Sequence, residues 1–202
     1  MISGRYSIHF DRMGFPLAQH SDWSFAIGLL PVSKYQFERF MIEHGPQGEL
    51  YTDAWYRARL TLNPRAPWRR CGDRPWELFV TGVERDSITP FLNYLGRDYR
   101  LPNATEWRCL WHVTAELQAQ GVAFIEACGD TAARPVRHWL KHGLYPLTDQ
   151  GLLEWVVQTG ELSCIGRPYL GLLPNTWSPD STREVNWELA RRAVGFRVVR
   201  DR

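Results

Sequence analysis

Cysteine thiols are the side chains of this sequence best suited to redox or metal chemistry, and their spacing limits both. The four of them are Cys71, Cys109, Cys128 and Cys164. None belongs to a Cys-x-x-Cys or Cys-x-x-His pair, so the sequence lacks the ligand spacing of a structural zinc site. We expect four plain thiols, which commonly pack as small hydrophobic side chains in proteins of a reducing compartment.

Two histidines have a spacing compatible with metal binding. His138 and His142 stand four residues apart and would share one face of a helix. Arg134, Arg137 and Lys141 surround them, and nearby positive charge opposes binding of a divalent cation. We therefore interpret the stretch as a solvated basic patch. A hydrolytic site is not indicated either, because the sequence has no Gly-x-Ser-x-Gly segment.

The composition is that of a globular protein with a substantial core. The chain has 202 residues, of which 44% are hydrophobic, 23% charged and 13% aromatic, including 10 Trp. These proportions exclude a disordered chain, a collagen-like repeat and a coiled coil. The net charge of +2 does not support the chain-wide basic field of a non-specific nucleic-acid binder.

The same numbers give expectations about domain organisation and cellular location. At roughly 100–200 residues per domain, we expect a single domain over residues 1–202. Arg5, His9 and Asp11 interrupt the apolar residues at the N-terminus, and no window approaches the roughly 18 apolar residues of a membrane span. We expect a soluble cytoplasmic protein without membrane contact.

The first half of the sequence predicts one strand and one well-marked helix. A short apolar strand over 24–30 ends at a proline. Ser33 and Gln36 then form a capping-box pattern, and Phe37 and Phe40 follow on one helical face. The helix is expected to end before Gly45-Pro46.

The middle of the sequence is less regular. Residues 46–75 have no sustained period and predict an irregular excursion, with one short helix around 53–60. Residues 76–83 are compatible with a short strand. Ser87 is a candidate cap for a helix over 88–95 that carries a proline in its first turn and a glycine just past its end.

The clearest local signal precedes a helix expected over 104–118. Asn103 can cap this helix, and Glu106 stands three residues later, where its carboxylate can reach back to a free N–H. Short apolar runs over 152–157 and 194–199 then predict strands between long loops. Helices in the first half and strands in the second indicate a loop-rich α+β domain with two or three helices.

Four segments, in order, resemble one known family. Residues 31–40 (PVSKYQFERF) are similar to an opening helix of pattern P-V-T-x-x-x-Y/F-x-x-F, and residues 99–107 (YRLPNATEW) to Y-R-L-P-T-E-A-E-W. Residues 151–156 (GLLEWV) resemble N-V-W-E-W-V, and residues 194–200 (VGFRVVR) resemble a closing G-F-R-V-V-R. Together they resemble the formylglycine-generating-enzyme or sulfatase-modifying-factor domain, a variant of the C-type-lectin-like fold. The resemblance implies that fold for nearly the whole chain.

We interpret the matching residues as structural. Glu106 is expected to be a cap rather than a catalyst, and Trp155 to fill the core. Arg197 is a charge among apolar neighbours, so it must reach a buried carboxylate or carbonyl. The structural set comprises Arg100, Pro102, Glu106, Trp107, Trp155, Phe196 and Arg197.

The resemblance implies a reaction, but the residues for it are missing. In enzymes of this family a cysteine pair, copper and oxygen oxidise a substrate cysteine, and that pair lies just before the closing motif. Soft Cu(I) requires thiolates held close together. Here residues 165–194 contain no cysteine, and Cys164 lies upstream. We therefore favour a non-enzyme. The alternative is a copper- or iron-dependent oxidase of thiol substrates, built from Cys164 and His138 or His142.

Calcium is the remaining cofactor that the resemblance implies. Its site draws oxygen ligands from an Asn, nearby carbonyls and a Glu, as a hard cation requires. Glu154 matches the Glu, but Gly151 stands at the Asn position. Asp149 or Gln150 would have to supply the missing oxygen. We otherwise expect no cofactor.

The preferred hypothesis is a protein-binding module that keeps the scaffold without its chemistry. Trp, Tyr and Arg are enriched at interface hot spots. The candidate binding residues in the C-terminal region are Arg167, Tyr169, Trp177, Arg183, Trp187, Arg191 and Arg192. The partner we expect is another protein of a bacterial regulatory or defence complex. A diversified ligand-binding receptor is an alternative, although residues 167–194 lack the excess of Asn, Tyr and Ser that it predicts.

Overall fold

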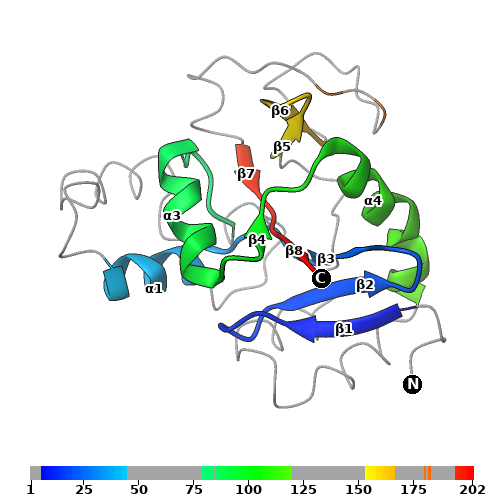
Figure 1. The fold of residues 1–202 in the computed structure, drawn as a ribbon, viewed down its shortest axis with the longest axis horizontal. Helices are drawn as coiled ribbons and strands as arrows, with labels where there is room; N and C mark the ends of the chain where they lie inside the picture. The colour runs from blue at the N-terminus through cyan, green and yellow to red at the C-terminus, as the bar shows by residue number, and fades with distance from the viewer. Residues whose placement is uncertain are drawn as a thin grey trace.

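The chain forms a mixed α+β structure. The computed structural model describes residues 6–44, 79–83, 85–119, 153–166, 180, 182 and 194–202, and everything below concerns these residues. They contain three helices and two sheets (Figure 1). The predicted α+β class is therefore confirmed.

The larger sheet has five antiparallel strands in the order β1-β2-β3-β8-β4. Its first three strands follow one another along the chain, β1 over Tyr6–Phe10, β2 over Pro16–His20 and β3 over Phe25–Gly28. The C-terminal strand β8 (Val199–Asp201) lies between β3 and the short strand β4 (Tyr99–Arg100), as Figure 1 shows. Residues 199–201 thus form an interior strand of this sheet.

The smaller sheet has three strands in the order β6-β5-β7. β5 (Leu153–Gln158) and β6 (Glu161–Ile165) form an antiparallel hairpin, and β7 (Val194–Phe196) lies parallel to β5 on its other side. β7 and β8 are separated by Arg197 and Val198 alone. The C-terminal segment therefore leaves one sheet and enters the other within two residues.

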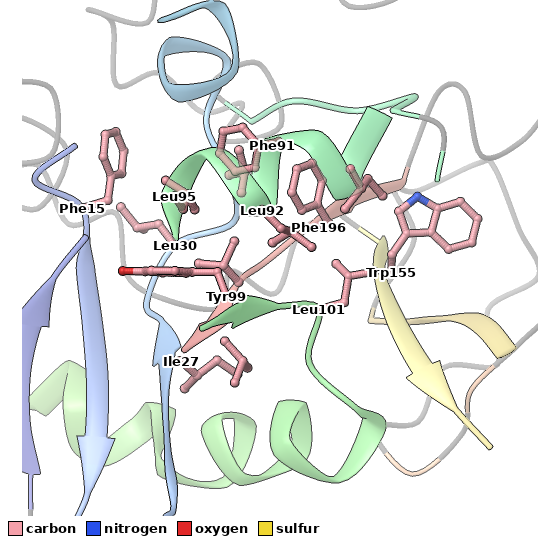
Figure 2. Close-up of a cluster of buried hydrophobic side chains, with 14 of the residues drawn as sticks. Phe15, Ile27, Leu30, Phe91, Leu92, Leu95, Tyr99, Leu101, Trp155 and Phe196 are labelled. Carbon is pink, nitrogen blue, oxygen red and sulfur yellow. The ribbon is translucent and has the colours of Figure 1, made fainter. Parts of the chain in front are cut away.

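Three helices surround the strands. α1 (Lys34–His44) and α3 (Arg85–Leu95) pack against each other, and α3 also contacts β4. Figure 2 shows α3 above β4 and α4 (Ala104–Ala119) below it. The space between these helices and strands holds the hydrophobic core.

The centre of that core is aromatic and joins three elements. The Phe91 ring of α3 lies 5.5 Å from Phe37 and 5.5 Å from Phe40 of α1, and 5.6 Å from Phe196 of β7. Edge-to-face geometry, as between Phe40 and Phe91 or Phe91 and Phe196, is favourable for aromatic pairs. Figure 2 shows Phe91 and Phe196 in this cluster beside Leu92 and Leu95.

Several predicted elements are confirmed. The helix expected over 104–118 is α4, and the helix expected after Ser33 is α1. In both, the capping box forms as predicted. The Ser33 amide donates to Gln36 Oε1 at 2.9 Å, and the Gln36 amide donates to Ser33 Oγ at 3.2 Å. The strands expected over 24–30 and 152–157 correspond to β3 and β5.

Other predictions are wrong in part. A hairpin of β1 and β2, which was not predicted, precedes β3. α3 begins at Arg85, which places Ser87 inside the first turn rather than at the cap. The strand expected over 194–199 is two strands in two sheets, because the chain crosses between them at Arg197. Of the residues described within 76–83, only Phe79 forms a bridge, to Ser33.

The last two expectations concern the middle of the chain and membrane spans. The irregular excursion over 46–75 and its short helix over 53–60 lie outside the described residues. None of the helices that the structure describes has both the length and the apolar content needed to cross a bilayer.

The β5–β6 turn generates a stability prediction. Thr159 and Gly160 form a two-residue loop with φ of 49° and 85°, a combination that favours Asn-Gly. A β-branched residue is strained there. We expect Thr159→Asn to raise the free energy of unfolding by about 1 kcal/mol, measured by urea denaturation. Thr159→Val, which keeps the β-branched side chain, is the control, and an equal gain from it would contradict the explanation.

Candidate functional site

The ion pair of Arg197 and Glu154 is buried on both sides. Arg197 Nε donates to Glu154 Oε2 at 2.8 Å, and Arg197 Nη2 donates to Glu154 Oε1 at 2.8 Å. The side chains are 0% and 3% exposed. A bidentate pair of this kind satisfies both carboxylate oxygens, which offsets part of the cost of burying two charges.

The pair lies where the two sheets meet. Glu154 is on β5, and Arg197 follows β7, its parallel neighbour. A third bond runs to the larger sheet, since Arg197 Nη1 donates to the Gly28 carbonyl at 2.6 Å. The Gly28 amide in turn donates to the Val198 carbonyl at 2.8 Å. A Cβ at Gly28 would lie only 3.2 Å from the Leu30 carbonyl oxygen, so glycine suits this close approach.

This arrangement confirms the prediction for Arg197 and bears on the calcium hypothesis. Arg197 reaches both a carboxylate and a carbonyl, the two partners that were expected. The guanidinium engages both oxygens of Glu154, the residue expected to bind calcium. A cation at Glu154 would have to compete with that positive charge. Asp149, the other expected ligand, lies outside the described residues.

A second polar cluster lies at the start of α4 and contains the motif residues Arg100 and Glu106. The Asn103 amide donates to Glu106 Oε2 at 2.8 Å, and the Glu106 amide donates to Asn103 Oδ1 at 2.9 Å. Glu106 is therefore a cap of α4, as predicted. Arg100 donates to Glu106 at 2.7 Å and to Asp201 at 2.8 Å, which ties the cap to the last strand. The hydrogen bond to Glu106, followed by that to Asp201, raises the pKa of Arg100.

The remaining motif residues are part of the core. Pro102, Trp107, Trp155 and Phe196 are all buried, as the structural interpretation predicted. The Pro102 carbonyl accepts a hydrogen bond from the Val157 amide at 2.9 Å, which joins the start of α4 to β5. The residues of the structural set therefore either lie in the core or form hydrogen bonds and ion pairs within the protein.

A third polar cluster was not anticipated from the sequence. Asp11, in the turn between β1 and β2, is only 6% exposed and receives hydrogen bonds from the amides of Met13 and Phe15 at 2.8 and 2.9 Å. The sequence feature that could have predicted this turn is an Asp three residues before Gly14, which has a φ of 79°. Asp side chains often bond the backbone of such turns.

Cys164 has a position that does not suit chemistry with an external substrate. It lies on β6 opposite Trp155 and is 0% exposed. Cys109 is half-buried, and burial raises the pKa of its thiol, which lowers its reactivity. Within the described ranges, no group of three or more His, Cys, Asp or Glu side chains is placed to hold a metal ion. Cys71, Cys128, His138 and His142 lie outside those ranges.

The predicted binding residues cannot be placed. Arg167, Tyr169, Trp177, Arg183, Trp187, Arg191 and Arg192 all lie outside the described residues. Comparison with known proteins does not add to their assignment. No protein-family model matches the chain, and no curated protein sequence matches it significantly.

The ion pair generates a prediction about stability. Arg197→Met leaves a buried, uncompensated carboxylate and is expected to lower the free energy of unfolding by about 3–5 kcal/mol. Arg197→Met with Glu154→Leu removes both charges, so the double variant is expected to be more stable than Arg197→Met alone. Urea denaturation measures both. If the double variant were no more stable than Arg197→Met, the unpaired charge would not be the cause of the loss in the free energy of unfolding.

The α4 cap generates a second stability prediction. Glu106→Ala removes the return bond to Asn103 and the pair with Arg100, and is expected to cost about 2 kcal/mol. Glu106→Gln keeps an oxygen acceptor and is expected to cost about half as much. Thermal and urea unfolding of the two variants test this. Equal losses would mean that charge, and not capping, dominates at this position.

Proposed function

We propose that this protein is a non-catalytic protein-binding module on a scaffold of the formylglycine-generating-enzyme type, with a C-type-lectin-like fold. The described α+β architecture is compatible with that scaffold, and the four motif segments carry the resemblance. The proposed partner is another protein, and a bacterial regulatory or defence complex is the setting that we favour.

The observation that carries the proposal is the double engagement of Glu154 by Arg197. Glu154 is the motif residue that the resemblance associates with ligand binding, and here both of its oxygens are bonded within the protein. Glu106, the other motif carboxylate, is bonded in the α4 cap and to Arg100. The two carboxylates are thus used to hold the structure together, and fold alone does not supply a reaction.

A rigid base that carries long loops is well suited to recognition. The residues proposed to make contact are those of the C-terminal region, with Trp177 and Arg183 as the principal anchors. Aromatic and Arg side chains dominate the binding energy of many interfaces. Calcium is not part of the proposal, because Arg197 occupies the carboxylate that would bind it.

A pull-down from the source cell, followed by rebinding of the purified partner, tests the proposal. Trp177→Ala with Arg183→Ala is expected to abolish capture, because both anchors are lost. Arg97→Ala with His112→Ala, at two exposed positions, is the matched control and is expected to bind normally. Recovery of free monomer alone, under gentle lysis, would contradict the proposal.

Metal analysis and a thiol-peptide oxidation assay test the enzyme alternative on the same preparation. We expect no turnover, and no loss of function in Cys164→Ser. Copper or iron near one equivalent, together with turnover that depends on Cys164, would replace the binding proposal with the oxidase.

A further inference from the structure

Asp11 is a buried carboxylate that joins two elements far apart in the sequence. One of its oxygens, Oδ1, closes the β1–β2 turn by accepting the Met13 and Phe15 amides. The other, Oδ2, accepts a hydrogen bond from Gln36 Nε2 of α1 at 3.1 Å. Gln36 also accepts the Ser33 amide through Oε1 at 2.9 Å. The Gln36 side chain therefore both completes the capping box of α1 and bonds Asp11 in the β1–β2 turn.

We propose that Asp11 is a proton-controlled latch between the β1–β2 turn and the start of α1, tighter when its carboxyl group is protonated and looser when it is ionised. A buried charged carboxylate carries a desolvation cost that a neutral one avoids. A protonated carboxyl group still accepts hydrogen bonds through its remaining lone pairs, so the contacts of the turn persist in acid.

The direction of the effect follows from the two protonation equilibria. Burial raises the pKa of Asp11 from 3.8 to about 6, against the lowering effect of hydrogen bonds from Phe15, Met13 and Gln36. In an opened turn the carboxyl group is in water and regains its ordinary pKa. The closed state therefore binds the proton more tightly, and it loses stability relative to the open state as pH rises through about 6.

Other charged and titratable groups lie on the elements around Asp11. The turn contributes Arg12, whose guanidinium lies over the Tyr94 ring of α3, 4.3 Å from its centroid. α1 contributes the buried Lys34 at its first position. β4 contributes Tyr99, whose pKa is raised by burial and then by the Asp11 charge, and lowered by Arg200 of β8. None of these groups has an ordinary pKa near 6. Histidines also stand on β1, β2 and α1, at His9, His20 and His44, and the Asp11→Asn variant separates their effect from that of Asp11.

Opening of the latch would change a specific contact region. Arg12 donates to the Tyr94 carbonyl at 2.8 Å and so joins the turn to the end of α3. The Phe15 ring stacks on Tyr35 of α1 with 6.2 Å between centroids. Release of the turn would separate both pairs and uncover the Tyr35 ring.

Hydrogen exchange measured by NMR tests the proposal on the intact protein. The Met13 and Phe15 amides are expected to exchange faster than the Ile27 amide in the middle of the sheet, because the turn opens without global unfolding. After correction for intrinsic rates, their protection is expected to fall about tenfold between pH 5 and pH 7. Equal protection of Met13, Phe15 and Ile27, or protection that does not fall with pH, would overturn the proposal.

Two further measurements identify the group responsible. Asp11→Asn keeps one oxygen for the turn amides and is expected to abolish the pH dependence, whereas Asp22→Asn, at an exposed aspartate in the next turn, leaves it unchanged. Direct titration of the Asp11 carboxyl carbon in the unmodified protein is expected to have its midpoint near pH 6. A midpoint below about 4.5, close to the ordinary aspartate value, would overturn the proposal even if Asp11→Asn fails to fold.

Discussion

The Arg197–Glu154 pair is the constraint on which the rest of the structure depends. A guanidinium with no exposed surface must be neutralised inside the protein, and only a carboxylate held beside it by the parallel pairing of β5 and β7 can do this. The same guanidinium binds the Gly28 carbonyl of β3. One side chain therefore bonds both sheets, beside the backbone bonds that Gly28 and Val198 make where the sheets meet.

The other two polar clusters extend this principle to the helices. Arg100 connects the α4 cap to β8, and the Asp11–Gln36 contact connects the first hairpin to the α1 cap. Gln36 satisfies the Ser33 amide and bonds Asp11 directly. Glu106 satisfies the Asn103 amide and is linked to β8 through Arg100. Directional polar bonds of this kind orient the elements, whereas the hydrophobic core, which includes Phe37, Phe91 and Phe196, buries the apolar surface.

Local signals in the sequence were sufficient for the starts of α1 and α4 and insufficient for the start of α3 and for the sheets. The Ser33–Gln36 and Asn103–Glu106 spacings predicted both caps, since each cap is formed within four residues. The need of Arg197 for a buried partner was also predictable, but its identity was not, because it depends on the β5–β7 register. The N-terminal hairpin was not predicted, although Tyr6, Ile8 and Phe10 alternate with polar residues in the pattern of a half-buried strand. The apolar run at 194–199 gave no sign that the chain changes sheets within it.

The position of β8 between β3 and β4 has a consequence for biosynthesis. β3 and β4 are translated first, and the position between them is filled by residues 199–201, which are translated after both. Until then β3 and β4 present unpaired edges to other nascent chains, and such edges promote aggregation. Completion of the larger sheet is thus postponed until residues 199–201 have been made.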